Sequence, residues 1–305
     1  MAVTENKYQL GTAENQKFLQ DVRDGLLSFG HQFPSPGGSS YYLGDDGTPW
    51  KDRNRETWIT SRMTHVYSIG SMLGHEGSEA LADAALKGLR GELHDDQNGG
   101  WYAGLTKDNN WRIPEHFSSD WVPDLECNKD RPDDQFKPYG ATPGHGIEWA
   151  RLITQWALST YKEDKAGATS YIEAAENLYN RAVSDAWNAD GAPGICYTTD
   201  WNGKPVVHDR MHWTLAEAIN ASAVLHRVTG KEKYAADYAE FMKYLDEKVL
   251  DHVNGSWFHQ LDRENNLLET VWPGKSDIYH ALQATLIPYY DPSLSIAVAV
   301  KKCRL

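Results

Sequence analysis

The sequence repeats one structural unit, in which two stretches with the periodicity of amphipathic helices are followed by a short segment rich in turn residues. The turn-rich segment occurs three times, as NGGWYAGLTKDNN (98–110), GICYTTDWNGKP (194–205) and NGSWFHQLDRENN (254–266). Each copy has a glycine turn, alternating aromatic and polar residues and a second turn rich in Asp and Asn, which is typical of a small β-hairpin. The repeat predicts an all-α array of helical hairpins with small β-hairpins in the connecting loops, which can close into an α/α toroid.

About eight helices are expected, in one domain that spans residues 1–305. Their approximate bounds are 13–29, 56–73, 77–93, 146–161, 168–187, 213–229, 233–250 and 276–287. In a toroid of helical hairpins the inner helices start at the same end. Residues at the N-termini of these helices are therefore expected to converge on one mouth of the barrel.

The aromatic composition favours a sugar ligand, because Trp and Tyr combine an apolar face with a polar group. The chain has 12 Trp and 16 Tyr against 7 Phe. A net charge of −13 without a Lys/Arg cluster argues against a nucleic-acid partner. No stretch is apolar enough for a signal peptide or a membrane span, which predicts a cytoplasmic protein without a membrane partner. The scattered cysteines Cys127, Cys196 and Cys303 do not form a disulfide framework.

Residues Pro138–Arg151, PYGATPGHGIEWAR, carry the strongest candidates for catalysis. His145 falls at or just before the first turn of a predicted helix, and Glu148 follows three residues later on the same face. The positive end of a helix disfavours an imidazolium ion, so His145 is expected to be neutral and able to accept a proton near pH 7. Taken alone, a helix-capping histidine and a solvated glutamate explain the pattern equally well.

Residues Val271–Ala281, VWPGKSDIYHA, repeat this layout of Pro-Gly, helix start and histidine. Ser276 or Asp277 is a suitable N-cap, and His280 falls in the first turn within an apolar run. A single histidine in such a run is usually a structural one. Two histidines near helix N-termini that converge are better explained as an acid/base pair.

Two further groups of residues are candidates for sugar binding. Trp58, Arg62 and His65 share one helix face, and Arg62 has the donors to hold a sugar hydroxyl or a developing enolate oxygen. A partly buried ion pair explains Arg62 equally well. Trp213 could stack on a sugar ring, although a core tryptophan is the commoner explanation. Glu217, one helical turn later in an apolar stretch, requires a partner or a function.

No metal or cofactor is predicted. The four-residue spacing of His208 and His212 can bind a metal, but no third ligand follows in a recognisable motif. The Walker, GxGxxG, GxSxG and protein-kinase motifs do not occur in the sequence. The chemistry is therefore expected to rest on side chains alone.

Several distinctive segments run from about Trp58 toward the C-terminus. They are ITSRMTHVYS, NGGWYAGL, RIPEHF, PYGATPGHGIEWARL, DGAPGICYTTDWNGKPV, HWTLAEA and WPGKSDIYHA. Together they resemble the N-acylglucosamine 2-epimerase family, and within it the aldose–ketose isomerase branch. The resemblance implies an (α/α)6 barrel and cofactor-independent chemistry on a monosaccharide through a cis-enediol. It also implies roles in proton transfer or substrate binding for six residues, namely His145 and His280 as catalytic residues and Arg62, Glu148, Trp213 and Glu217 as substrate-binding residues.

The sequence departs from the family between Leu105 and Arg112. The family barrel has about twelve helices, two in each hairpin, and about four of them separate the segments that match GGWYAGL and RIPEHF. Here only TKDNNW lies between Leu105 and Arg112. The missing block would supply a third active-site histidine and a sector of the barrel wall. Its loss is expected to expose an apolar face, which predicts instability, aggregation or a homo-oligomer.

The resemblance also indicates a substrate. The sulfoquinovose isomerases carry an arginine where this chain has Gln135, and a glutamine where it has Ser276. A neutral sugar such as mannose, converted to fructose, is therefore expected.

Three other functions remain open. A 2-epimerase, acting on a free or N-acylated sugar, removes the same C2 proton but returns it to C2. A sugar-binding protein without activity would result if the missing block is required for catalysis. A glycosidase would use two carboxylates, for instance those of Glu148 and Asp277.

Overall fold

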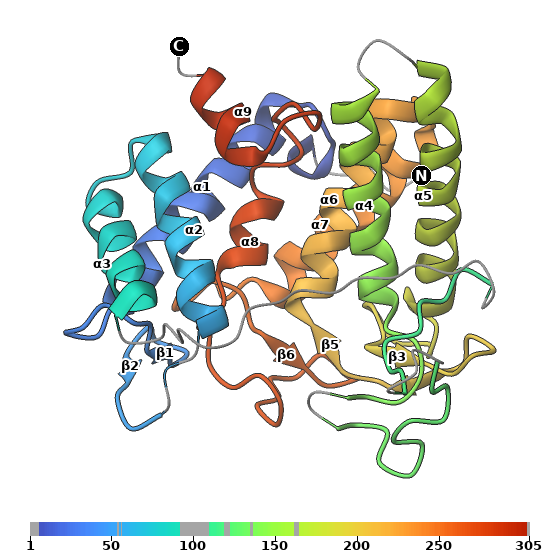
Figure 1. The fold of residues 1–305 in the computed structure, drawn as a ribbon, viewed down its shortest axis with the longest axis horizontal. Helices are drawn as coiled ribbons and strands as arrows, with labels where there is room; N and C mark the ends of the chain where they lie inside the picture. Colours follow the sequence, from blue (N-terminus) through green and yellow to red (C-terminus); the bar gives the residue numbers. More distant parts are fainter. Residues whose placement is uncertain are drawn as a thin grey trace.

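A computed structural model describes residues 6–53, 55, 57–91, 110–118, 123–134, 137–161 and 165–303. The first of the three turn-rich segments, except for its last residue, and Gln135 lie outside the described residues. Helical hairpins and short two-stranded sheets make up the described part of the chain (Figure 1).

The expected helices are found at all eight positions, with differences in their bounds. The helices are α1 Ala13–Phe29, α2 Thr57–Leu73, α3 Ser78–Gly91, α4 Pro143–Thr160, α5 Lys165–Ala186, α6 His212–Thr229, α7 Glu232–Tyr244, α8 Tyr279–Ala284 and α9 Ile296–Cys303. Short 3₁₀ helices cover Asn6–Tyr8 and Gly30–Gln32, and a π-helical turn covers Leu245–Val249.

The last third of the chain departs most from the expected helices. The helix expected over 233–250 ends at Tyr244 and continues as the π-helical turn. The helix expected over 276–287 is confined to α8, because residues after Ala284 form successive turns that lead to Pro288. Proline lacks a backbone N–H and disfavours helical conformation in the residue before it. The helix α9 was not expected at all.

In the described part of the chain, four helices form an inner wall. α6 packs against α4 on one side and α8 on the other, and α8 packs against α2. α3, α5 and α7 cover α2, α4 and α6 from outside. The N-termini of the four inner helices face the side of the molecule that carries the strands (Figure 1). α6 lies at the centre of the wall, and every residue from His212 to Leu225 is buried.

The strands that the structure describes form three antiparallel pairs at this end. They are β1 Tyr42–Leu43 with β2 Pro49–Trp50, β3 Thr198–Thr199 with β4 Pro205–Val207, and β5 Arg210–Met211 with β6 Gln260–Leu261. The hairpin expected over 194–205 is therefore found as β3 and β4. The segment 254–266 does not form the expected hairpin of two paired strands. Its strand β6 pairs with β5, which lies just before α6, and Leu261 makes a single bridge to Leu267.

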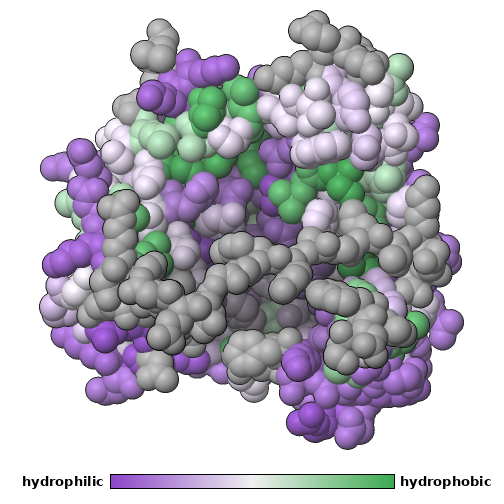
Figure 2. Space-filling view, viewed as in Figure 1, coloured by the Kyte–Doolittle hydropathy of each residue, from purple (hydrophilic) through white to green (hydrophobic). Residues whose placement is uncertain are grey.

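The inner wall is open between α2 and α4, which do not pack closely on each other within the described residues. A groove of about 540 Å³ runs along α4 on this side, between Glu148, Trp156, Gln283 of α8 and residues 287–296. Figure 2 shows apolar side chains on both sides of this hollow and polar ones within it. Leu152 and Trp156 of α4 are 38% and 48% exposed. The predicted homo-oligomer stays a prediction.

None of the helices in the described part is long and apolar enough to cross a bilayer.

Candidate active site

A pocket of about 170 Å³ lies where the inner helices converge. Its lining residues are Arg62 of α2, His145 and Glu148 of α4, Trp213 of α6, His280 of α8, and the loop residues Tyr197 and Trp272. The structure therefore brings five of the six candidate residues to one cavity. Glu217 lies directly behind it.

His280 contacts a carboxylate that is itself held by an arginine. Arg151 donates two hydrogen bonds to Glu217, from Nε to Oε2 at 2.6 Å and from Nη2 to Oε1 at 3.0 Å. Nδ1 of His280 lies 3.1 Å from Oε1 of Glu217. Burial would raise the pKa of Glu217, but Arg151 and then His280 outweigh it and lower that pKa to about 2. Glu217 is thus an anion with two partners, Arg151 and His280.

His145 forms the second pair of histidine and carboxylate. Nδ1 of His145 lies 2.7 Å from Oε1 of Glu115, its ring lies 4.9 Å from that of Trp213, and 40% of the side chain is exposed. Burial lowers the pKa of His145, but Glu115, together with Glu148 and Glu217, outweighs burial and raises it above its usual value. The helix end alone favours a neutral His145, and the direction of this pKa shift is opposite to that expectation. Glu115, 30 residues earlier in the chain, favours the imidazolium form.

Arg62 fits both explanations drawn from the sequence. It lines the pocket, and its guanidinium also forms an ion pair with the carboxylate of Asp277. The same guanidinium lies 4.8 Å from the ring of Trp58 and 5.3 Å from that of Tyr279. These contacts fix the direction in which the donors of Arg62 point.

Asp277 is a buried anion. Its side chain is 1% exposed, and Oδ1 accepts a hydrogen bond from the backbone N–H of Tyr279, the first residue of α8, at 3.1 Å. The N-cap of α8 is Ile278, and not Ser276 or Asp277 as the sequence predicted. Burial would raise the pKa of Asp277, but Arg62 foremost lowers it to about 2. Because Asp277 is committed to Arg62 and does not line the pocket, it is a poor candidate for a glycosidase carboxylate.

A stacked histidine pair supports Asp277 from behind. The ring centroids of His212 and His259 lie 4.1 Å apart with nearly parallel planes, and Nε2 of His212 lies 3.2 Å from the backbone oxygen of Asp277. Burial lowers the pKa of both histidines, that of His212 to about 4, so both are neutral. His212 begins α6, whereas His208 precedes β5, so the two histidines do not lie on one helix.

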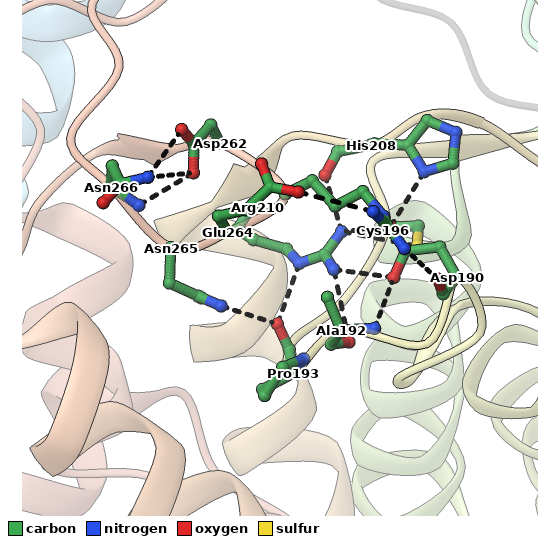
Figure 3. Close-up of polar contacts among 11 residues, drawn as sticks. Asp190, Ala192, Pro193, Cys196, His208, Arg210, Asp262, Glu264, Asn265 and Asn266 are labelled. Carbon is green, nitrogen blue, oxygen red and sulfur yellow. Dashed lines mark hydrogen bonds and ion pairs between the residues drawn. The ribbon is translucent and has the colours of Figure 1, made fainter.

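His208 belongs to another cluster, with Asp190 and Cys196 (Figure 3). Within the described part of the chain, this is the one group whose possible metal ligands lie within 4.8 Å of one another. Arg210 already supplies the positive charge there, because Nη2 donates to Oδ1 of Asp190 at 2.8 Å and Nη1 to Sγ of Cys196 at 3.4 Å. Burial raises the pKa of the Cys196 thiol to about 11, which favours the protonated thiol beside Arg210. The cluster is a structural ion pair and does not fit a metal site.

Sequence reasoning did not assign several residues that the structure places at the site. Glu115 and Arg151 both lie in segments that were recognised, RIPEHF and GIEWAR, but neither was given a partner. Nothing in their spacing shows that Glu115 reaches His145 or that Arg151 reaches Glu217. Tyr197 carried no signal beyond its place in a turn-rich segment.

Gly144 allows α4 and α6 to approach closely beside the pocket. A Cβ atom at this position would lie 2.6 Å from Cγ2 of Thr214 and 2.7 Å from Cη2 of Trp213. We expect Gly144→Ala to displace Trp213, to lower the free energy of unfolding by about 1–3 kcal/mol and to raise KM for a sugar. Urea denaturation and steady-state kinetics measure both. Gly25→Ala in α1, where a Cβ meets nothing within 4 Å, is the matched control and should not destabilise the protein. Equal effects of the two substitutions would contradict this account.

Comparison with known proteins places the chain in a family. The sequence model of the N-acylglucosamine 2-epimerase (GlcNAc 2-epimerase) family matches residues 37–109 and 104–284. The chain belongs to this family. The two matched stretches overlap at 104–109, where the sequence predicts a missing block between Leu105 and Arg112.

Named relatives in the family are D-mannose isomerases. That of Pseudomonas cannabina pv. alisalensis is 36% identical over 252 residues, which cover 82% of this chain and 59% of the relative. The chain thus spans about 59% of that relative's length. That of Thermobifida fusca is 28% identical over 404 residues, which cover 94% of this chain and 98% of the relative. Because 404 exceeds the 305 residues of this chain, this relative has residues without a counterpart here.

Solved structures of other proteins share the fold. A crystal structure of D-mannose isomerase superimposes with a TM-score of 0.76 at 18% identity, over 89% of this chain and 97% of the other. A sugar epimerase from a ruminal bacterium gives 0.62 at 15% identity, over 88% and 98%. The expected fold class, an α/α toroid of helical hairpins, is confirmed by these similarities.

Proposed function

We propose that this family member is a cofactor-independent sugar isomerase that interconverts an aldose and its ketose, with D-mannose and D-fructose as the pair. The observation that carries the proposal is that His145 and His280 line one pocket and each has Nδ1 next to a carboxylate. The relatives named D-mannose isomerase support the choice of sugar. The pocket, at about 170 Å³, is smaller than the roughly 300–1,000 Å³ of sites for drug-sized ligands, which suits a single monosaccharide.

The carboxylates determine which ring nitrogen is available to the sugar. A carboxylate anion only accepts hydrogen bonds, so Nδ1 of each histidine carries the proton that it donates to Glu217 or Glu115. Nε2 of each ring is then the nitrogen left for the substrate. In the neutral form Nε2 accepts a proton, and in the imidazolium form it donates one.

Two proton exchanges complete the reaction on an open-chain aldose. Nε2 of His280 takes the proton from C2 while Nε2–H of His145 donates a proton to O1, which gives the cis-enediol. His145 then takes the proton from O2, and His280 returns its proton to C1. The product is the ketose, and both histidines recover their initial protonation states.

The other lining residues hold the sugar and its developing charge. Arg62, fixed by Asp277, presents guanidinium donors to an enolate oxygen. Glu148 is placed to accept hydrogen bonds from sugar hydroxyls, and Trp213 offers a ring face between the two histidines, 4.9 Å from His145 and 5.9 Å from His280. Glu217 acts through His280 and does not line the pocket.

Incubation with D-mannose in D2O, followed by NMR, tests the proposal. Fructose labelled at C1 is the expected product. Glucose labelled at C2 would instead identify a 2-epimerase, since the enediol would then be reprotonated at C2. Binding of mannose without turnover would instead indicate a sugar-binding protein without activity.

A further inference from the structure

We propose that Glu115 is a positioning residue for the reaction: through its contact with Nδ1 it holds His145 with Nε2–H directed at the sugar. This inference rests on the proposed function. It adds a residue that acts on His145 and does not itself line the pocket.

Two anchors fix the short segment that carries Glu115. Three residues before it, Arg112 is buried against Asp185 of α5, with Nε 2.7 Å from Oδ2 and Nη2 3.1 Å from Oδ1. One residue after it, Nε2 of His116 lies 3.0 Å from the backbone oxygen of Pro138. The carboxylate of Glu115 is thus delivered to His145 by a segment held on both sides, as positioning requires.

The two histidine–carboxylate pairs differ in charge. Glu217 shares its negative charge between Arg151 and His280. Glu115 forms an ion pair with His145 and with no arginine or lysine within the described residues. Its charge is therefore directed at one ring, and this favours a proton on Nε2 of His145. This difference agrees with the proposed reaction, in which His145 first donates a proton and His280 first accepts one.

Other charged groups also surround His145. Burial lowers its pKa, whereas Glu115 first, then Glu148 of its own helix and Glu217 of α6, raise it. The remaining ionisable groups that line the pocket are Arg62 of α2, His280 of α8 and Tyr197 near β3. Glu115 is the group in direct contact with the ring, so its removal should have the largest effect on the pKa of His145.

The test is Glu115→Gln, measured in two ways on the full chain. The first is the titration of the His145 ring protons by NMR, assigned with His145→Asn, and it needs no turnover. We expect the pKa of His145 to fall. The second is the pH dependence of mannose isomerisation. Because activity requires the imidazolium form, its loss on the alkaline side should move to lower pH, with kcat reduced up to about a hundredfold and KM little changed.

Two further variants complete the test. Glu126→Gln changes an exposed glutamate in the neighbouring segment, where it pairs with Lys129, and should alter neither measurement. Glu115→Asp keeps the charge but shortens the side chain, and its kcat should lie between those of Glu115→Gln and the wild type. If Glu115→Gln does not fold, the same two measurements are made on Glu115→Asp. An unchanged titration of His145 in Glu115→Gln, or a lower kcat with the wild-type pH profile, would overturn the proposal. Absence of turnover in the wild type would instead overturn the proposed function, while the NMR titration would still decide the role of Glu115.

Discussion

Replacement of His280 with alanine is expected to lower kcat for mannose isomerisation by a factor of about 10²–10⁴. His280 supplies the proposed acceptor for the C2 proton, and its Nδ1 contact with Glu217 holds the ring in the pocket. No other histidine lines the pocket from α8 or α6 within the described residues. KM should change less than kcat, because the proton is transferred in the transition state and Arg62 and Glu148 remain to bind the sugar.

His280→Gln separates the loss of the base from a loss of packing. Gln fills much of the volume of the imidazole and keeps an N–H donor for Glu217, but it is not a base. Both variants should therefore lose kcat to a similar extent, while His280→Gln should melt closer to the wild type. A variant with less than a tenfold loss of kcat would exclude His280 as the acceptor of the C2 proton.

Arg151→Met is expected to lower the free energy of unfolding by about 3–5 kcal/mol, because it leaves Glu217 as a buried anion without its cation. The side chains of Arg151 and Glu217 are 6% and 0% exposed, so water cannot solvate the orphaned carboxylate. Methionine fills the volume of the aliphatic part, and the effect is therefore chiefly electrostatic. Denaturation by urea at pH 7 measures the loss.

The pH dependence of stability gives an independent measure of the same pair. The pKa of Glu217 is lowered from its ordinary 4.5 to about 2 in the folded protein. A lowered pKa stabilises the fold above the unfolded value and loses this contribution as pH falls through the folded value. The wild type should therefore lose the stability due to Glu217 between about pH 4.5 and pH 2. Arg151→Met should show a weaker loss over this range.

Two controls test the electrostatic explanation. Lys233→Met removes an exposed cation paired with Asp237 and should cost less than about 1 kcal/mol. Glu217→Gln added to Arg151→Met removes the uncompensated charge and should recover most of the lost stability. If the double variant is as unstable as Arg151→Met, the effect comes from packing and not from charge.

Much of the fold could be predicted from the sequence, because helix formation depends on residues that are close together in the sequence. The bounds of α1 and α6 follow from periodicity and from the turn residues that flank them, and Gly230 ends α6 with a positive φ of 67°. α8 could not be delimited in this way, because its apolar residues continue past Ala284 while the turns before Pro288 end the helix. The pairing of β5 with β6 joins segments about 50 residues apart, which no local pattern reveals.

The candidate site was predictable to the extent that it lies on helices. His145 and His280 were found because each lies near the start of a predicted helix and follows Pro-Gly, and helices of one barrel layer start at one end. The side chains that pair with the site residues were not predictable, since an ion pair depends on distances between segments that are far apart in the sequence. Glu115 and Asp277 both act across long sequence separations, on His145 and Arg62, and both change the charge that the site presents.

The buried pair of Arg112 and Asp185 has a consequence for how this family can diverge. It fastens the chain to α5 just after residues 104–109, where the two family matches meet. Arg112 lies three residues before Glu115, so the ion pair with Asp185 fixes the start of the short segment that carries Glu115. The position of Glu115 beside His145 therefore depends on the anchor to α5, and a change in the length of the chain before Arg112 need not separate these two side chains.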